Sequence, residues 1–555
     1  MGIFTLHQRV LEDYQNFIRS FLWIRDERIR EFVDQELMEA ARLWPEPLLQ
    51  LSPAYRLAMT PDELVKQGRL HPETARIFRR QDGSAHRLYQ HQVEAIQLAH
   101  EGKSFVVTSG TGSGKTLCFL IPIVDAVLRN PHLPRPTAFI VYPMNALANS
   151  QLQALRELKQ SYENRTGQPF PIRFARYTGE TPEEEREAIR KDPPHILLTN
   201  YVMAELLLVR PEDRPLLATG DGLVFLVFDE LHTYRGRQGA DVAMLVRRLK
   251  ARLARSPVIH IGTSATLVAG PQATPEERRR AVAEFASVFF GADIPPDQVV
   301  EETLEPATVG GPPAPEALRA ALGGPLPEDT EEFRRHPLAR WLEYAVGVEV
   351  EPDGRLRRRA PRPISEVAQE LAEQTGESEE QCRKAIEGLL LRAAELKQHL
   401  PEPFFAFKLH QFISQGKALY ATLEPPDRRS FSLGGEIDAQ RPLYPLRFCR
   451  ICGHEYYHVL RAKGFFLPYP VGEEVAEEDL KAGYLAFADD WSEEQVPDDW
   501  RDANGQLRNT WRGRVPQPVW VRPDGSFSEG EVPGAVKMWW QAGRLWLCLS
   551  CGEYY

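Results

Sequence analysis

The residues whose types and spacing point most directly to chemistry lie in a glycine-rich turn between Ser109 and Thr116. A short β-branched run precedes this turn, and a segment with helical character follows Lys115. Glycines let backbone N–H groups close around an oxyanion, and the N-terminus of the following helix adds its positive dipole end. In such a loop the lysine reaches the terminal phosphates and the threonine hydroxyl binds magnesium. The turn therefore predicts a phosphate-binding loop, although Ser109 stands where the general pattern has glycine.

A second candidate site follows the apolar run that ends at Phe228. This run predicts a buried strand that delivers Asp229 and Glu230 to its carboxyl end. There Asp229 can hold magnesium through water and Glu230 can polarise an attacking water molecule. Such acidic pairs also occur in solvated turns, so the interpretation depends on the phosphate loop about a hundred residues upstream. Further residues fit relays that couple nucleotide state to domain movement, with simple loop hydrogen bonding as the alternative: His232, Ser264, Ala265 and Thr266.

Strands and helices alternate around these motifs. Strands are predicted over residues 137–142, 173–179, 195–200, 223–230 and 258–267, with helices over 144–155 and 181–190. Repeated β-α units with near-continuous apolar strands imply a parallel sheet with helices on both faces. Ligands of such sheets collect at the carboxyl ends of the strands, so both candidate sites are expected at one edge.

Length, composition and charge are those of a multidomain globular protein. A chain of 555 residues predicts about three or four domains, each able to bury its own core. The net charge of −11 gives no overall attraction to nucleic acid. Any nucleic-acid path must therefore have a local lining of basic residues, since the surface as a whole does not attract nucleic acid.

Signals for secretion or membrane insertion are missing from the sequence. No apolar run reaches the roughly 18 residues of a membrane span, and Met1 is not followed by a basic and then an apolar segment. Six cysteines in a chain of this size do not suggest a secreted disulfide scaffold. We therefore expect a cytoplasmic location and no membrane partner.

Helical patterns precede the α/β region and return after it. Apolar residues recur at helical spacing over 5–43, and another helical stretch covers 61–80; both are interpreted as a preamble packed on the α/β domain. The stretch 268–360 is rich in Pro, Gly, Glu and Arg, and its apolar segment 285–294 is expected to close that domain. The arginine-rich run 355–363 predicts a solvated basic linker, with phosphate contact as the alternative.

Two amphipathic helices are predicted on either side of Gly376, with a spacing like that of a helix-turn-helix. A winged-helix-like inset and a plain helical hairpin both fit this pattern. Cys382 lies within the second helix and is expected to be a small core residue.

From about Phe404 the pattern changes to short strands, and four cysteines form two matching Cys-x-x-Cys-Gly pairs: Cys449 with Cys452, and Cys548 with Cys551. Each such turn aims two thiolates from one hairpin, and structural zinc takes four in a tetrahedron. The pairs therefore predict one zinc site in a ribbon with a long insertion. Redox-active dithiols are the alternative, but no thioredoxin-like β-α-β pattern surrounds the pairs. His454 and His458 lie nearby and could substitute as ligands, but with four cysteines present they are left out of the predicted site.

The predicted insertion holds most of the tryptophans: Trp491, Trp500, Trp511, Trp520, Trp539, Trp540 and Trp546. Aromatic side chains can stack on single-stranded bases at about 1–3 kcal/mol each. However, the acidic stretch 473–479 in the same segment disfavours a nucleic-acid path there. We interpret the tryptophans as core or partner-docking residues.

Taken together, the motifs resemble those of superfamily 2 helicases of the DEAD/DEAH type. SGTGSGKT, YPMNALANSQ, YTG, LLTN, DELH and TSAT occur in the family's order between Tyr89 and Leu267. The stretch DELHTYRGRQGADVAMLVRRL is similar to the subgroup that includes the Hrq- and MrfA-like DNA repair helicases, and similar proteins occur in bacterial anti-phage systems. The resemblance implies a RecA-like fold and an ATP-driven motor that tracks one nucleic-acid strand, usually from 3′ to 5′.

The resemblance also implies roles for individual residues. Gln92 would hydrogen-bond to the adenine edge of ATP, and Thr116 with Asp229 would hold Mg²⁺. The implied catalytic residues are Lys115, Asp229, Glu230 and His232. The implied ATP-binding residues are Gln92, Ser109, Gly110, Thr111, Gly112, Ser113, Gly114, Lys115 and Thr116. The implied nucleic-acid path, made largely through phosphate contacts, is Pro143, Asn145, Gln151, Thr178, Gly179, Thr199 and Asn200.

The sequence departs from the family in one respect. A complete motor has a second RecA-like domain with a Q-x-x-G-R-x-x-R-type motif, and no such motif follows Leu267. Without an arginine finger, hydrolysis should fall by roughly 10³ or more. We therefore expect either a chain that stops before the second motor half or a partner that supplies it, and little ATPase from this chain alone.

The sequence thus predicts an α/β protein with four regions: an N-terminal helical region (1–84), a RecA-like ATP-binding helicase domain (85–300), a linker with a helical inset (301–403) and a β-rich four-cysteine zinc module (404–555). The predicted function is an ATP-dependent DNA helicase or translocase. Its partners would be single-stranded or branched DNA, a second RecA-like domain, and DNA repair or anti-phage defence proteins. The alternatives are an ATP-gated nucleic-acid clamp or scaffold without unwinding, and an RNA helicase or remodeler.

Overall fold

The structure is a computed structural model that describes residues 2–21, 23–39, 44–110, 112–133, 135–218, 224–253, 257–265, 273–396, 404–413, 418–434, 441–470 and 480–554. Thr111, Thr266 and the acidic stretch 473–479 lie outside the described residues. The chain divides into two units. The α/β unit comprises Ser52–Gly311 and Glu343–Arg359, and the cysteine unit comprises Met1–Leu51, Pro312–Leu342 and Ala360–Tyr555. Each unit is described by itself.

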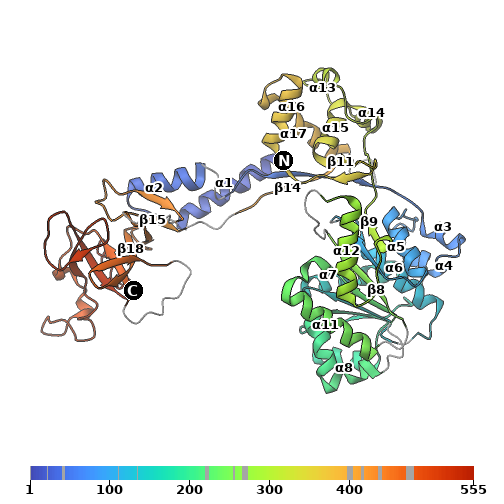
Figure 1. Ribbon diagram of the computed structural model, residues 1–555, viewed down its shortest axis with the longest axis horizontal. Coiled ribbons are helices and arrows are strands. Elements are labelled where there is room, and N and C mark those ends of the chain that lie inside the picture. The colour runs from blue at the N-terminus through green and yellow to red at the C-terminus, as the bar shows by residue number, and fades with distance from the viewer. Residues whose placement is uncertain are drawn as a thin grey trace. The chain divides into compact units, whose positions relative to one another are not determined.

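A parallel seven-stranded sheet forms the core of the α/β unit (Figure 1). Its strand order is β5-β6-β4-β7-β8-β3-β9. The strands are β3 (Phe105–Thr108), β4 (Ala138–Tyr142), β5 (Phe174–Arg176), β6 (Ile196–Asn200), β7 (Phe225–Phe228), β8 (Ile259–Ser264) and β9 (Val299–Glu301). The four residues of β7 are all buried, because helices cover both faces of the sheet. The predicted α/β fold with a parallel sheet is confirmed.

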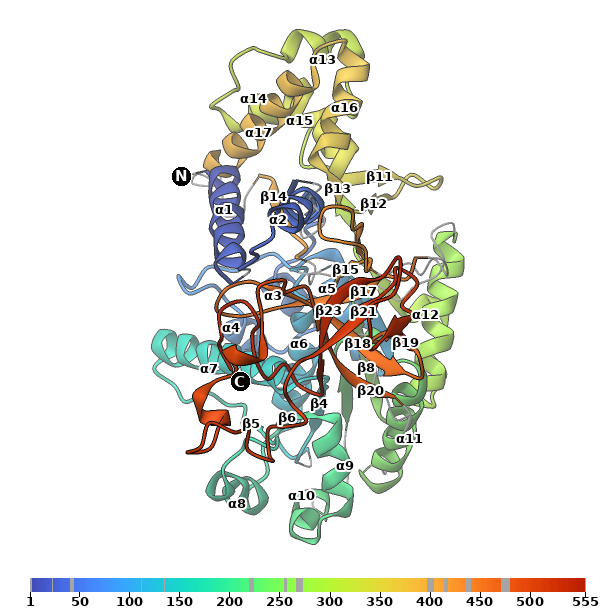
Figure 2. The ribbon, with the colours of Figure 1, turned by 90° about the vertical axis from the view of Figure 1, so that its left-hand side faces the viewer.

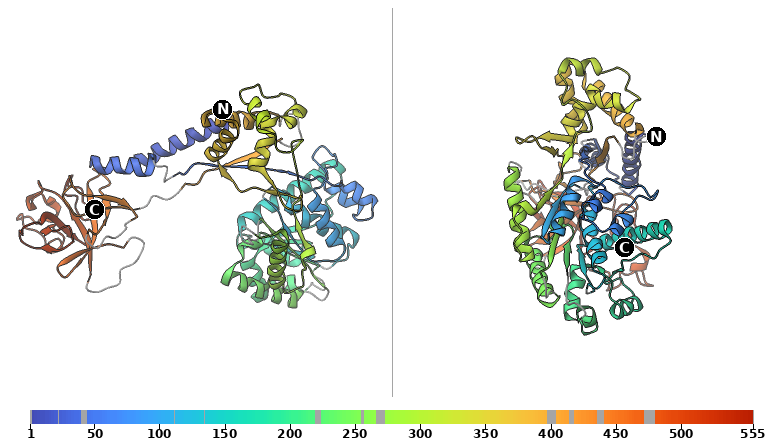
Figure 3. Two further views of the ribbon diagram at one scale, coloured as in Figure 1. Left: turned by 45° about the horizontal axis from the view of Figure 1, so that its top comes forward. Right: turned by 90° about the vertical axis from the view of Figure 1, so that its right-hand side faces the viewer.

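The two faces of the sheet have separate cores because successive strand residues point to opposite sides. Ile140 packs in one core and its neighbours Phe139 and Val141 in the other. The first face carries α3 (Pro61–Lys66), α4 (Pro72–Ile77), α5 (Gln90–His100), α6 (Lys115–Arg129) and α7 (Asn145–Thr166). The second carries α8 (Glu183–Lys191), α9 (Tyr201–Val209), α10 (Arg214–Ala218), α11 (Gly236–Leu253) and α12 (Pro275–Phe290), as Figure 3 shows for the longer helices. Among the described helices, none has the length and apolarity that crossing a membrane requires.

The α/β unit includes chain that follows the expected end of the domain at residue 300. Strand β9 pairs with β3, and β10 (Leu304–Glu305) pairs with β2 (Ala54–Tyr55). After η5 (Glu343–Gly347), the hairpin of β11 (Val348–Val350) and β12 (Leu356–Arg358) also belongs to this unit. The prediction of a solvated basic linker over 355–363 is therefore wrong at Arg358, whose side chain is only 15% exposed because it pairs with Glu302.

The N-terminal helices belong to the cysteine unit. These are α1 (Ile3–Phe21), α2 (Glu27–Val33) and the π-helix η1 (Asp34–Glu39). Ile29 and Val33 are buried in the core of that unit's large sheet. The prediction that residues 5–43 pack on the α/β domain is therefore wrong for α2, whose buried face meets this other sheet, while Leu6, Val10 and Phe17 of α1 are exposed. The stretch 61–80 does pack on the α/β core, through Leu64 and Ile77.

The helical inset is part of a larger helical cluster, coloured yellow to orange in Figure 3. Its helices are α13 (Pro315–Ala321), α14 (Thr330–Arg335), α15 (Pro337–Leu342), α16 (Ile364–Thr375) and α17 (Glu379–Leu396). Gly376 ends α16 with a φ of 75°, a left-handed conformation that suits glycine. A three-stranded sheet accompanies the helices, with β1 (Leu48–Ser52) between β13 (Arg362–Pro363) and β14 (Ala406–His410). Cys382 is fully buried in α17, which confirms its prediction as a core residue.

A nine-stranded sheet builds the rest of the cysteine unit, in orange and red in Figure 2. Its strands are β15 (Leu419–Ala421), β16 (Phe431–Leu433), β17 (Tyr444–Phe448), β18 (Glu455–Ala462), β19 (Phe465–Pro468), β20 (Lys481–Ala486), β21 (Gln517–Val521), β22 (Phe527–Ser528) and β23 (Val536–Ala542). Residues between the two cysteine pairs form most of this sheet, so the long segment predicted as an insertion between the pairs is itself folded. Trp491, Trp500, Trp539 and Trp540 are buried, as predicted for core tryptophans.

Candidate functional site

The predicted phosphate loop connects β3 to α6 in the α/β unit. Ser109 N–H donates to Ser264 O at 3.1 Å, which fixes the start of the loop to the neighbouring strand β8. Gly112 and Gly114 have φ values of 84° and 70°, which favour glycine at both positions. Lys115 begins α6, and its Nζ donates to Ser109 O at 3.1 Å. Thr116 lies in the first turn of the same helix.

Gln92 is in direct contact with this loop. Its side chain is 1% exposed, and Nε2 donates to Gly114 O at 3.1 Å while Oε1 accepts from Tyr89 N–H at 2.9 Å. A Cβ at Gly114 would lie 2.5 Å from the same Nε2, so a side chain at this position would displace the amide. The amide thus fixes the shape of the loop, and both of its ends have protein partners. His91, which the sequence reasoning missed, adds a contact between Nε2 and Ser113 O at 2.9 Å.

The predicted acidic pair follows β7 and faces the loop. Lys115 Nζ lies 3.9 Å from Glu230 Oε1. Burial raises the pKa of the Asp229 carboxyl, with the nearby Glu230 carboxylate adding to the rise. Glu230 has a φ of 53° and is the only non-glycine residue with a positive φ within the described ranges. Such backbone strain concentrates at functional sites, where the surrounding structure maintains it.

Thr263 is a site residue that the sequence reasoning missed. Its hydroxyl donates to the Asp229 carboxylate and accepts the Glu230 N–H at 3.2 Å. The parallel register of β7 and β8 pairs Phe228 with Gly262, and the next step along both strands brings Thr263 beside Asp229. The sequence signal was available, because Thr263 is the first residue of the TSAT motif.

The predicted coupling residues converge on this acidic pair. His232 Nδ1, in the turn η3 (Leu231–Thr233), lies 3.2 Å from Glu230 Oε2 and 3.3 Å from Ser264 Oγ. Ser264 also accepts the Ser109 N–H of the phosphate loop through its backbone carbonyl. Ala265 is half-buried after β8, and Thr266 lies outside the described residues. A continuous series of contacts therefore links Ser109 of the phosphate loop to Glu230, by way of Ser264 and His232.

The predicted nucleic-acid residues lie at or just beyond the carboxyl ends of β4, β5 and β6, which are neighbours in the sheet, except for Gln151 in the second turn of α7. Asn200 Nδ2 donates to Asn145 Oδ1 at 2.6 Å, which joins two of them. Thr178 and Thr199 are fully buried, and Thr199 Oγ1 donates to Tyr177 O at 2.8 Å. Thr199 therefore helps to hold the segment after β5 in shape, whereas Thr178 Oγ1 is buried without a hydrogen-bond partner among the described residues. The remaining three are at least partly accessible: Pro143, Gln151 and Gly179.

Glu180 joins these residues to donors that the sequence reasoning missed. Its carboxylate accepts from Asn145 Nδ2 at 2.9 Å, from Asn149 Nδ2 at 3.2 Å and from Arg176 Nη1 at 3.4 Å. Two amides and one guanidinium thus converge on a single carboxylate. Asn149 follows Asn145 by four residues on α7, a spacing that places both on one helix face.

The four predicted cysteine ligands converge in the cysteine unit. Their Sγ atoms all lie within 4.8 Å of one another, with 3.9 Å between Cys449 and Cys551 and 3.6 Å between Cys452 and Cys548. Four thiolates about 2.3 Å from a tetrahedral zinc ion would lie about 3.8 Å apart. The donor set and spacing therefore fit zinc. The group found among the described residues consists of the four cysteines alone.

The two cysteine turns have the same backbone design. Gly453 N–H donates to Cys449 O and Gly552 N–H donates to Cys548 O, both at 2.9 Å. These glycines have φ values of 72° and 74°. A left-handed glycine thus turns each chain so that both thiolates face the same point.

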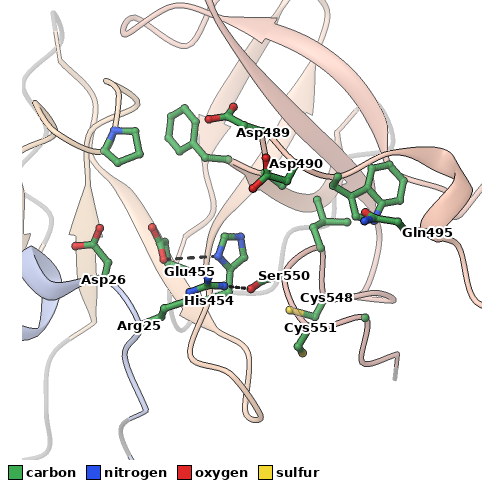
Figure 4. Close-up of a pocket in the computed structure, with 16 residues that line it drawn as sticks. Arg25, Asp26, His454, Glu455, Asp489, Asp490, Gln495, Cys548, Ser550 and Cys551 are labelled. Atoms are coloured by element: carbon green, nitrogen blue, oxygen red, sulfur yellow. Dashed lines mark hydrogen bonds and ion pairs between the residues drawn. The ribbon is translucent and has the colours of Figure 1, made fainter.

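A pocket of about 700 Å³ lies beside Cys548 and Cys551 (Figure 4). Its lining includes four carboxylates, from Asp26, Glu455, Asp489 and Asp490, and the guanidinium of Arg25. The Arg25 guanidinium donates to Ser550 Oγ, and the Arg25 backbone N–H donates to Gly453 O at 3.1 Å. These two bonds attach the N-terminal segment to both cysteine turns. The excess of carboxylates disfavours a phosphate ligand in this pocket.

Comparison with known proteins assigns the motifs of the α/β unit. The family model of the DEAD/DEAH box helicases matches residues 89–274. Residues 89–274 are a DEAD/DEAH box helicase domain. This domain contains the phosphate loop, the acidic pair and the predicted nucleic-acid residues described above.

Relatives extend over parts of much longer proteins. The Druantia protein DruE of Escherichia coli strain UMEA 4076-1 is 26% identical over 360 residues, which are 45% of this chain and 20% of that protein. The ATP-dependent helicase YprA of Bacillus subtilis strain 168 is 34% identical over 192 residues, which are 34% of this chain and 24% of that protein. The chain therefore spans about a fifth to a quarter of the length of these two relatives. The crystal structure of the DUF1998 helicase MrfA bound to DNA is 27% identical, with a TM-score of 0.36, over 46% of this chain and 30% of that one.

Proposed function

We propose that this chain carries the ATP-binding half of an ATP-dependent DNA helicase or translocase that moves on single-stranded DNA. The observation that carries the proposal is the convergence, at the carboxyl edge of one parallel sheet, of Lys115 and the strained Glu230, 3.9 Å apart. The names of the relatives support ATP-dependent helicase activity. The resemblance to repair and anti-phage helicases supports a pathway of DNA repair or phage defence.

The residues of the α/β unit have complementary tasks in ATP binding and hydrolysis. Lys115 would bind the terminal phosphates, and Glu230 would orient and polarise the attacking water. Thr116 and Asp229 offer a hydroxyl and a carboxylate, oxygen donors that suit Mg²⁺. The ion would neutralise charge on the phosphates. Thr263 holds Asp229 in place and supports the backbone of Glu230.

The nucleic-acid path that we propose runs over the ends of β4, β5 and β6. Asn145, Asn149 and Arg176 present amide and guanidinium donors there, and phosphate oxygens accept such bonds without sequence preference. This region adjoins the ATP site, because β4 lies between β6 and β7. Asp229 N–H donates to Val141 O of β4 at 3.0 Å, a direct link between the two sites.

An ATP-gated clamp that does not unwind DNA is the second candidate function. Within the described residues there is one parallel sheet of the RecA-like kind, whereas a full motor closes its ATP site between two. A chain with one such sheet can bind nucleotide and nucleic acid while hydrolysing ATP slowly. In both readings the four cysteines would hold one structural zinc ion.

The test of the proposed site is nucleotide binding by a Lys115→Ala variant. We expect the affinity for a fluorescent Mg²⁺–ATP analogue to fall by about 100-fold or more, because the phosphates lose their direct cation. Lys103→Ala is the matched control, because Lys103 is exposed and pairs only with Glu101 among the described residues. Unchanged affinity in the Lys115 variant would show that the loop does not bind phosphate.

The same protein can be titrated with single-stranded DNA and RNA of one sequence in the presence of a non-hydrolysable ATP analogue. Tighter binding to DNA is expected, and tighter binding to RNA would favour an RNA remodeler. Strand separation on a partial duplex discriminates the motor from the clamp, because only the motor unwinds DNA. It is measured with the two units and any second motor half present.

A further inference from the structure

A charged pair outside the predicted site residues lies directly against the phosphate loop. A Cβ placed on Gly110 would lie 2.7 Å from Arg358 Nη2 and 2.8 Å from Arg358 Cζ. The guanidinium therefore packs directly against the loop, and a side chain at Gly110 would displace it. Arg358 comes from β12, almost 250 residues beyond the loop, and belongs to the same α/β unit.

Glu302 connects this guanidinium to the backbone of the loop. Its Oε2 accepts the Gly110 N–H at 2.7 Å, and Arg358 Nε lies 3.4 Å from its Oε1. Arg358 Nη2 also donates to the Tyr55 hydroxyl at 2.8 Å. The side chains of Glu302 and Arg358 are only 18% and 15% exposed, so water screens their charges weakly.

A carboxylate on a phosphate loop creates an electrostatic problem. The loop is built to receive the several negative charges of a nucleoside triphosphate, and a fixed negative charge beside it repels them. Arg358 neutralises that charge while Glu302 retains its bond to Gly110. The carboxylate thus holds the loop, and the guanidinium removes the electrostatic cost of doing so.

We propose that Arg358 is a positioning residue for the nucleotide phosphates, which acts by neutralising Glu302 at the phosphate loop. The inference rests on the proposed function of the loop as an ATP site. It assigns a role in nucleotide affinity to the hairpin of β11 and β12, although that hairpin lies outside the matched helicase domain.

The neighbouring arginine on the same strand provides a matched control. Arg357 points to the other side of β12 and forms an ion pair with Glu349 at 3.4 Å, with a side chain that is 43% exposed. Arg357→Ala removes the same charge from the same strand without touching the loop.

The test is a double-mutant cycle of Arg358→Ala and Glu302→Gln, read as the affinity for a fluorescent Mg²⁺–ATP analogue. Arg358→Ala should weaken binding by at least about 10-fold, because the Glu302 carboxylate is left uncompensated. Glu302→Gln should bind the analogue more tightly than the wild type. The double variant should return to within about 3-fold of the wild type, since it lacks the repelling charge as well. Arg357→Ala should not change the affinity.

Each other outcome has a defined meaning. An Arg358→Ala variant with unchanged affinity overturns the inference, as does a double variant that stays as weak as Arg358→Ala, because the pair would then act only in packing. Thermal unfolding checks that the variants fold, and if Arg358→Ala does not, Glu302→Gln alone decides by its affinity. A wild-type chain that binds no nucleotide would instead refute the proposed function itself.

Discussion

At the scale of residues, the site is defined by side chains that hold one another before any ligand is present. Lys115 rests on Ser109 O, Gln92 on the loop carbonyls, and Asp229 on Thr263. Each contact fixes a group that would otherwise lose conformational freedom when ATP binds. Preorganisation of this kind lowers the entropic cost of binding.

Glu180 leads to a prediction at the same scale. Because its carboxylate takes the donors of Asn145, Asn149 and Arg176, it competes with a backbone phosphate for them. Glu180→Gln keeps one acceptor oxygen, replaces the other with an amide donor and removes the charge. We expect its affinity for single-stranded DNA to rise by about 3- to 10-fold at low salt, with a steeper dependence of affinity on salt concentration.

The matched control is Glu184→Gln, which removes an exposed carboxylate in the first turn of the nearby helix α8. Fluorescence anisotropy with one labelled oligonucleotide measures all three proteins. Equal gains in both variants would reflect overall charge, and a loss of affinity in the Glu180 variant would show that the carboxylate supports the donors instead of competing with DNA.

At the scale of elements, the parallel sheet determines where the chemistry occurs. Strands β3, β7 and β8 end at the nucleotide residues, and β4, β5 and β6 end at the predicted nucleic-acid residues. Since parallel strands share one carboxyl edge, the topology of the sheet is enough to place the two sites next to each other. The same sheet contains a buried histidine on β8, His260, whose Nδ1 lies 3.1 Å from Ser104 Oγ.

Burial lowers the pKa of His260 to about 3, with a smaller contribution from the nearby Lys250 cation. The unfolded chain has the ordinary histidine pKa of about 6.5, so on acidification it takes up a proton that the folded sheet does not. Above pH 6.5 this residue is neutral in both states and does not lower the free energy of unfolding. As the pH falls from 6.5 toward 3, protonation of the unfolded chain lowers that free energy progressively. Between pH 7 and pH 5 the free energy of unfolding should decrease by about 2 kcal/mol from this group.

Urea unfolding of the wild type and a His260→Gln variant at pH 7 and pH 5 tests this prediction. The variant should be less stable at pH 7 but should lose less stability on acidification, because it has no imidazole to protonate. His132→Gln, at an exposed position of the same unit, should behave like the wild type. Identical losses in all three proteins would show that His260 does not control the acid sensitivity.

At the scale of the whole molecule, the chain has two units with separate chemical centres. The nucleotide residues lie in the α/β unit, and the four cysteines lie in the cysteine unit. The cysteine turns also hold the N-terminal segment through Arg25. The metal site is therefore expected to stabilise one unit and to leave the other intact.

Zinc content and zinc removal test this expectation. Elemental analysis should find about one zinc per chain. Cys551→Ser should reduce that content and lower the unfolding temperature of the cysteine unit, while the affinity for the ATP analogue stays unchanged. Glu553→Gln, at an exposed position beside the second cysteine turn, is the control with four intact thiols. A metal-free but stably folded wild-type chain would contradict the zinc assignment.

Particular residues show how far the sequence reached. The succession of strands along the chain from β3 to β8 was predictable, because it depends on local periodicity. The phosphate loop, the acidic pair and the four cysteines were predictable because each is a motif with fixed spacing. Thr263 was one residue outside the predicted triplet. Asn149 lies within the YPMNALANSQ motif but was given no role, and Arg176 and Glu180 flank the YTG motif without belonging to it. Their importance comes from contacts between the ends of neighbouring strands, which local patterns do not contain.

The sequence by itself determined the chemistry of this protein, because glycine, lysine, carboxylate and thiolate groups at those spacings have few other uses. Only the tertiary structure decided which distant segments share a core. It placed Ile29 and Val33 in the cysteine unit and Arg358 on the phosphate loop. An amphipathic helix or an arginine-rich run is compatible with many surfaces, and the choice among them depends on shape and charge complementarity that arise only when the chain is folded.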